Sequence, residues 1–77
     1  MQQENTAPLR VGIAGLGRLG KRHAEQLARH TPGARLVAAC SPVAEELDWA
    51  RETLGVPRLY ADYAELLADP EIDAVVL

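Results

Sequence analysis

The chain has 77 residues, of which 48% are hydrophobic and 25% charged, so it can form one small domain of the soluble, globular class. One cysteine and no apolar run near the roughly 20 residues of a membrane span exclude a disulfide framework and predict a cytoplasmic protein without a membrane partner. Residues 1–40 hold six Lys or Arg against two acids (+4) and residues 41–77 two against nine (−7), so an anionic ligand is expected in the first half.

The first part of the chain predicts a tail, two strands and a helix. Residues 1–8 (MQQENTAP) lack the basic and apolar regions of a signal peptide, and we expect a disordered tail. Residues 9–15 (LRVGIAG) are apolar and end in glycine, which is typical of a buried strand. Residues 18–30 have a helical period that TPG at 31–33 ends, and ARLVAAC at 34–40 predicts a second buried strand.

Residues 41–55 (SPVAEELDWARETLG) predict a second helix with clear boundaries. Ser41 is the expected N-cap, Pro42 the first helical residue, and Gly55 lies just past the end. Trp49 falls on the outer face, where it either lies over its neighbours or contacts a segment or subunit outside this chain. The expected core face consists of Val43, Leu47, Ala50 and Leu54.

The remaining elements complete an alternating pattern. Residues 58–60 (RLY) predict a third strand, Asp62 and Glu65 form a D-x-x-E capping box for a short helix, and residues 73–77 (DAVVL) predict a fourth strand. The order β-α-β-α-β-α-β with short connections predicts an α/β domain over residues 9–77, with a parallel sheet and helices on its faces.

Three glycines follow the first predicted strand at the spacing G-x-G-x-x-G. Gly15 permits a tight turn, Gly17 lets a pyrophosphate approach the backbone, and Gly20 lets the helix pack closely on the strand. Free N–H groups at the helix start, together with Arg18, would receive the phosphates. The motif predicts a site for NAD or NADP, and its alternative is a glycine-rich turn that holds no ligand.

Ser41 occupies the end of the second strand, where an Asp or Glu would bond the ribose 2′-hydroxyl. A serine hydroxyl can bond either that hydroxyl or a 2′-phosphate, and no Arg follows it, so the choice between NAD and NADP stays open. Ser41→Asp is expected to favour NAD by repelling the phosphate. The residues predicted to bind the cofactor are Gly15, Leu16, Gly17, Arg18, Leu19, Gly20 and Ser41.

The segments LRVGIAGLGRLGKRHAEQL, LVAACSP and LGVPRLYADYAELLADPEIDAVVL make residues 9–77 resemble the N-terminal part of the glucose-fructose oxidoreductase and inositol dehydrogenase (Gfo/Idh/MocA) family. The resemblance implies a Rossmann-like sheet with strand order 3-2-1-4 and NAD(P)-dependent chemistry at a hydroxyl of a sugar, inositol or related polyol. Ser41 stands where many members carry Asp. The family's Glu-Lys-Pro motif with its catalytic lysine and its substrate domain are absent, so no catalytic residue is assigned and the substrate is expected only in a longer parent protein.

Two further functions remain open: a stand-alone nucleotide-binding or regulatory module without catalysis, and a fragment whose glycines are only structural. Nucleic-acid binding is not expected, because the basic residues share a helix face with Glu25 and lack interleaved aromatics. His23 is expected to be packed and hydrogen-bonded, and His30 lies about 10 Å farther along the helix, so the two cannot share a metal ion. Cys40 is expected to behave as a small buried hydrophobe.

The fourth strand, with AVVL at 74–77, falls at an edge of the sheet in the order 3-2-1-4. Its unpaired backbone groups and apolar side chains predict self-association through this edge. The loop that would follow this strand forms part of a dinucleotide crevice. We therefore expect residues 9–77 alone to bind weakly, through the adenosine and pyrophosphate portion.

Overall fold

The computed structural model describes residues 8–77, so the predicted tail falls, except for Pro8, outside the described residues. Strands and helices alternate as predicted: β1 (Leu9–Ala14), α1 (Arg18–Arg29), β2 (Ala34–Cys40), α2 (Ala44–Leu54), β3 (Arg58–Tyr60), α3 (Tyr63–Leu67) and β4 (Ala74–Val76). Within residues 8–77, no helix has both the length and the apolar character needed to cross a membrane.

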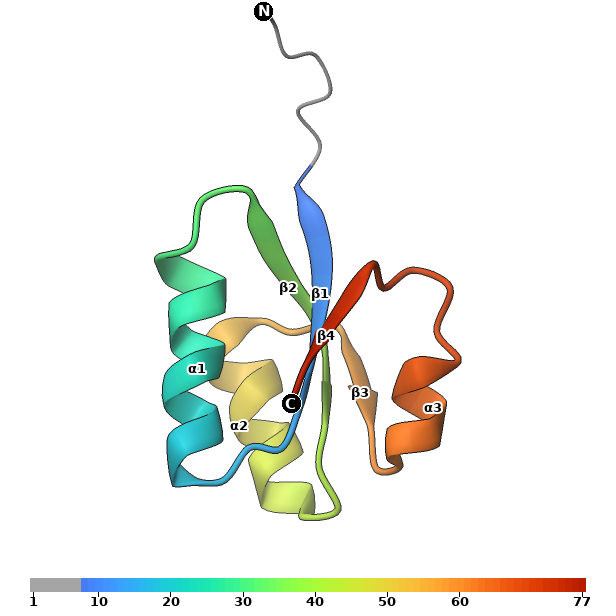
Figure 1. The fold of residues 1–77 in the computed structure, drawn as a ribbon. Coiled ribbons are helices and arrows are strands. Elements are labelled where there is room, and N and C mark those ends of the chain that lie inside the picture. Colours follow the sequence, from blue (N-terminus) through green and yellow to red (C-terminus); the bar gives the residue numbers. More distant parts are fainter. Residues whose placement is uncertain (1–7) are drawn as a thin grey trace, which may run out of the picture.

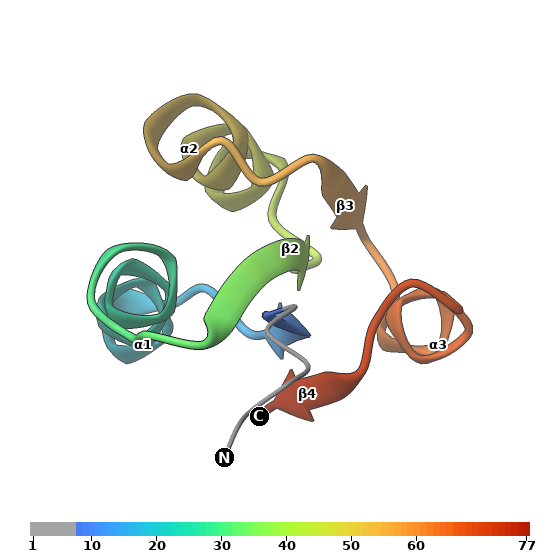
Figure 2. The same ribbon diagram turned by 90° about the horizontal axis from the view of Figure 1, so that it is seen from above.

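The four strands form one parallel sheet in the order β3-β2-β1-β4, which confirms the predicted topology. Helices α1 and α2 cover one face of the sheet and α3 covers the other (Figure 1, Figure 2). Because the strands are parallel, the connections into all three helices lie along one edge, the lower edge in Figure 1. β4 lies at the end of the sheet beside β1, and self-association through its outer side stays a prediction.

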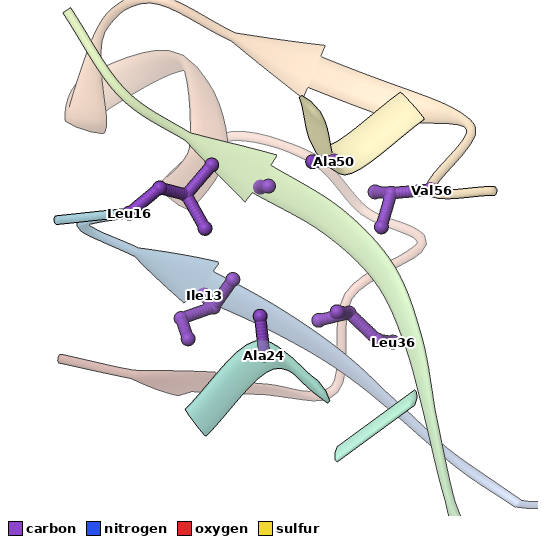
Figure 3. Close-up of a cluster of buried hydrophobic side chains, with 7 residues drawn as sticks. Ile13, Leu16, Ala24, Leu36, Ala50 and Val56 are labelled. Carbon is purple, nitrogen blue, oxygen red and sulfur yellow. The ribbon is translucent and has the colours of Figure 1, made fainter. Parts of the chain in front are cut away.

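The larger core fills the space between the sheet and helices α1 and α2 (Figure 3). The sequence contains no Phe, so this core is built from aliphatic and small side chains, and alanines at the helix contacts let the backbones approach closely. Its buried members are Ile13, Leu16, Ala24, Leu36, Ala39, Ala50 and Val56. The smaller core on the opposite face, under α3, contains Val37, Ala38, Cys40 and Leu66.

A register shift in β2 explains how this strand supplies both cores. Val11 of β1 pairs with Leu36, whereas the next residue, Gly12, pairs with Ala38, so Val37 is the extra residue of a bulge. The bulge breaks the alternation of side chains, and Leu36 and Ala39 therefore face the same core although they are three residues apart.

Helix α2 begins later than the sequence predicts. Its N-cap is Val43, so the prediction of Ser41 as N-cap and Pro42 as first helical residue is wrong. The Ser41 hydroxyl instead accepts a hydrogen bond from the Val43 N–H at 3.0 Å and donates to Glu46 Oε1 at 2.6 Å, which forms a turn ahead of the helix. The predicted end is confirmed, since Gly55 adopts the left-handed conformation with φ +68°.

Three of the four residues predicted for the core face of α2 are confirmed, because Ala50 belongs to the larger core and Leu47 and Leu54 pack against it. The fourth, Val43, is instead 44% exposed. Trp49 is half-buried and packs against the larger core, so its predicted place on the outer face is wrong, whereas the expectation that it lies over its neighbours is confirmed. The physical reason is the neighbouring helix α1, whose Lys21 ammonium lies 5.2 Å from the centre of the indole ring.

A buried carboxylate that the sequence does not reveal ties β3 to the chain before β4. The Asp69 side chain is fully buried, and its Oδ2 accepts hydrogen bonds from Arg58 Nε and the Tyr60 hydroxyl, both at 2.6 Å. The other oxygen accepts the backbone N–H of Glu71 at 2.8 Å. These bonds, led by that from Arg58, lower the pKa of Asp69 to about 2.

We predict that Asp69 makes the fold sensitive to acid. Because its pKa in the folded chain is lowered to about 2, its contribution to stability is complete above the ordinary value of 3.8 and is lost as the pH falls toward 2. Asp69→Asn should therefore lower the melting temperature at pH 7 and flatten its further decrease below pH 4. Circular dichroism melts between pH 2 and pH 7 measure both effects.

Asp48→Asn provides the matched control, because Asp48 is a half-exposed carboxylate that pairs with Arg51 within α2. An exposed pair of this kind contributes little to stability. Equal melting temperatures of wild type and Asp69→Asn across the pH range would contradict the prediction.

Candidate functional site

The connection from β1 to α1 is a tight turn that requires glycine at two positions. Gly15 has φ +99°, a conformation that side chains with a Cβ rarely adopt. A Cβ on Gly20 would overlap the carbonyl oxygen of Gly15 and lie 2.8 Å from its carbonyl carbon. The predicted roles of Gly15 in the turn and Gly20 in helix–strand packing are thus confirmed, and both hold without a ligand.

Gly17 differs from these two glycines, because nothing in the chain's own packing requires it. Its φ of −67° is open to any residue, and a Cβ built there meets no atom within 4 Å. The space above Gly17 is therefore open to an external group that approaches the backbone.

The start of α1 offers backbone donors that no side chain occupies. Its N-cap is Gly17, which has no side chain to cap the helix, and the first turn holds no acidic residue. The first intrahelical bond runs from the Lys21 N–H to the Gly17 carbonyl, so the N–H groups before Lys21 have no partner in the helix. Together with the helix dipole and exposed Arg18, these donors favour an anion.

Two hollows flank the glycine turn and share Ala14, Gly15 and Leu77. The first, the α1 hollow, is lined by Ile13, Ala14, Gly15, Gly17, Arg18, Leu19, Gly20, His23 and Leu77. The second, the β3 hollow, is lined by Ala14, Gly15, Cys40, Pro42, Ala61, Asp62, Tyr63 and Leu77. The turn thus stands between a hollow with basic side chains and one whose lining side chains are mostly apolar.

The predicted cofactor-binding residues fall into three groups in the structure. Gly15, Gly17, Arg18, Leu19 and Gly20 all line the α1 hollow. The Leu16 side chain is 1% exposed and belongs to the larger core, so only its backbone can face a ligand. Ser41 is also 1% exposed, and its hydroxyl is bonded to the Val43 N–H and to Glu46 of α2, as described above.

His23 lies at the site, contrary to its prediction as a packed and hydrogen-bonded residue. His23 is exposed and lines the α1 hollow, and its ring makes no hydrogen bond among the described residues. The helical period places His23 at the edge of the apolar face of α1, where a side chain is buried only if another helix or strand packs against it. Within residues 8–77 no such element covers His23, and its side of the helix faces the α1 hollow.

Asp62 is a second residue that the sequence does not assign to the site. Its Oδ1 accepts the Ala64 N–H at 3.1 Å, which confirms its predicted role as the cap of α3, and its side chain also lines the β3 hollow. One feature of the sequence could have indicated that Asp62 lies at the site. Asp62 follows the last residue of β3, Tyr60, by two positions, and ligands bind at the carboxyl ends of parallel strands.

Neither a reactive thiol nor a metal site is indicated among the described residues. Cys40 is buried and lies in the β3 hollow, and burial is the main cause that raises the pKa of its thiol. Among residues 8–77, no group of three His, Cys, Asp or Glu side chains could hold a metal ion.

Comparisons with known proteins match this geometry. The GFO_IDH_MocA family model, described as an oxidoreductase family with an NAD-binding Rossmann fold, matches residues 9–77. Scyllo-inositol 2-dehydrogenase (NAD(+)) of Bacillus subtilis is 39% identical over 69 residues, which make up 90% of this chain and 20% of that protein.

Solved structures support the same relationship. Apo scyllo-inositol dehydrogenase from Lactobacillus casei superposes with a TM-score of 0.89 and 43% identity, over 94% of this chain and 21% of that one. The crystal structure of that enzyme with bound cofactor NAD(H) and scyllo-inositol gives a TM-score of 0.86 and 46% identity. This match covers 88% of this chain and 20% of that one.

This chain spans about a fifth of the length of these relatives. The match of the family model to residues 9–77, the sheet order β3-β2-β1-β4 and the glycine turn agree with the resemblance seen in the sequence. The chain belongs to the Gfo/Idh/MocA oxidoreductase family, and it forms the NAD-binding Rossmann part of that family's fold.

Proposed function

We propose that this chain binds NAD(H) or NADP(H) as the dinucleotide-binding part of an oxidoreductase that acts on a hydroxyl of inositol, a sugar or a related polyol. The observation that carries the proposal is the open space at Gly17 beside the uncapped start of α1. A relative bound to NAD(H) and scyllo-inositol, 46% identical over 88% of this chain, supports both the cofactor and the substrate class.

The pyrophosphate would lie against the backbone N–H groups at Gly17 and the first turn of α1, with Arg18 adding a positive charge. The β3 hollow, which has Pro42 and Tyr63 among its lining residues, suits the flat apolar purine of the adenosine half. The α1 hollow, with His23, would then receive the nicotinamide half. When bound, the nicotinamide supplies the acceptor or donor of a hydride.

The substrate and the oxidoreductase activity are proposed for the protein as a whole. This chain corresponds to 20% of the Bacillus subtilis relative, and no residue of it is assigned to catalysis. A hydride-transfer assay with myo-inositol, scyllo-inositol and glucose tests this level of the proposal. Dinucleotide binding without turnover in a protein that contains the whole catalytic apparatus would instead favour a binding or regulatory module.

The first prediction from this proposal separates ligand contact from packing within the glycine turn. Gly17→Ala should lower the stability less than Gly20→Ala does, because the new Cβ meets no protein atom within 4 Å and the remaining cost is that of an alanine at an N-cap. It should weaken NAD⁺ binding at least tenfold, which corresponds to about 1.4 kcal/mol, because the methyl group occupies the path of the pyrophosphate. Calorimetric titration and thermal unfolding measure the two quantities.

Gly20→Ala is the matched variant, with the same added methyl group three residues away. It should lower stability by about 1–3 kcal/mol, because its Cβ would overlap the Gly15 carbonyl group. Equal NAD⁺ affinity of wild type and Gly17→Ala would rule out the glycine turn as the pyrophosphate site.

The second prediction concerns Ser41, whose direct contact with the ribose remains a proposal. Ser41→Asp would place a second carboxylate at a 1% exposed position beside Glu46, whose Oε1 now lies 2.6 Å from the hydroxyl. We expect a lower melting temperature, because a buried carboxylate at position 41 would be desolvated and repelled by the partly buried Glu46. The double variant Ser41→Asp/Glu46→Gln should recover part of the loss, and the absence of any recovery would contradict this explanation.

A further inference from the structure

The β3 hollow contains one charged side chain among its lining residues, that of Asp62. An acid at the end of β2 commonly distinguishes NAD from NADP, because it bonds the ribose 2′-hydroxyl and repels a 2′-phosphate. In this chain that end of β2 carries Ser41, whose hydroxyl is buried and bonded to Glu46 and the Val43 N–H. Any carboxylate that faces the adenosine ribose must therefore come from another element.

We infer that Asp62, at the end of the neighbouring strand β3, sets the charge at the 2′ position and makes the site favour NAD over NADP. The inference rests on the proposed function, since it places the adenosine half in the β3 hollow. The ribose connects the pyrophosphate at the glycine turn to the purine, so it must lie between Gly15 and the wall that holds Asp62 and Tyr63.

The charge balance of the hollow agrees with this assignment. None of the eight residues that line it is a lysine or arginine, so a 2′-phosphate would meet no cation there. Asp62 and, less strongly, Glu65 also raise the pKa of Cys40, which lies in the same hollow, although burial has the larger effect. Their negative potential thus reaches Cys40, one of the residues that line the hollow.

The orientation of the carboxylate is held by the backbone. Asp62 Oδ1 accepts the Ala64 N–H at 3.1 Å, which restricts the side chain of this lining residue. An asparagine can make the same bond with its amide oxygen and is an equally good cap. Asp62→Asn therefore removes the charge while keeping the start of α3.

The test is calorimetric titration of the 77-residue chain with NAD⁺ and with NADP⁺, at low salt and at about 0.5 M salt. Asp62→Asn should bind NADP⁺ about three- to tenfold more tightly than wild type does, as expected for a carboxylate several ångströms from a phosphate. Its NAD⁺ affinity should change by less than about twofold. High salt should reduce the difference between the variants, an effect that a purely structural role for Asp62 would not produce.

Two matched variants remove the same charge elsewhere. Glu65→Gln on α3 should shift the NADP⁺ to NAD⁺ ratio in the same direction but less, because Glu65 contributes less to the potential at Cys40. Glu52→Gln, in the last turn of α2 at the opposite edge of the sheet, should leave the ratio unchanged.

An unchanged ratio in Asp62→Asn, with normal NAD⁺ binding, would overturn the inference and leave the proposed function intact. A shift of equal size in Glu52→Gln would also overturn it, since the effect would then reflect net charge alone. Failure of the wild type to bind either dinucleotide would refute the proposed function, and the inference with it.

Discussion

The close contact between the end of β1 and the start of α1 is the constraint on which the rest of the structure depends. A Cβ at position 20 would overlap the Gly15 carbonyl group, so the helix can begin there only because Gly20 has no side chain. That approach brings Ala24 of α1 down onto the sheet beside Ile13 and directs Leu16 into the same core. It also leaves the first N–H groups of α1 at the carboxyl edge of the sheet.

At this edge the three helices begin under different electrostatic conditions. α2 has Glu45 and Glu46 in its first turn, and α3 is capped by Asp62, so both helix starts already face negative charge. α1 has neither an acid in its first turn nor a side-chain cap, and its first side chain is Arg18. A phosphate group is therefore favoured at the start of α1 and repelled at the starts of α2 and α3. In the proposed binding mode, the pyrophosphate thus lies at α1 and the uncharged adenosine lies toward α3.

Ion pairs that join β1 and β3 to the chain before β4 lie at the opposite edge. Arg10, near the start of β1, pairs through its guanidinium with Asp73 at 3.1 Å and Glu71 at 2.8 Å, and so fixes the chain before β4. Arg58, at the start of β3, pairs with buried Asp69. Because these ion pairs are distant from the glycine turn, substitutions at the binding edge can change ligand affinity without breaking the contacts that position β3 and β4.

The sequence by itself determined the alternating elements, the parallel sheet and the glycine turn, because hydrophobic period, helix ends and glycine spacing depend on residues close together in the chain. Only the tertiary structure decided that Ser41 is buried, that Trp49 lies against α1, that Asp62 reaches the β3 hollow and that Asp69 is enclosed by Arg58 and Tyr60. Each of these outcomes depends on which element lies beside the residue. Local patterns leave that neighbour undefined, because it is set by strand order and helix packing between segments far apart in the chain.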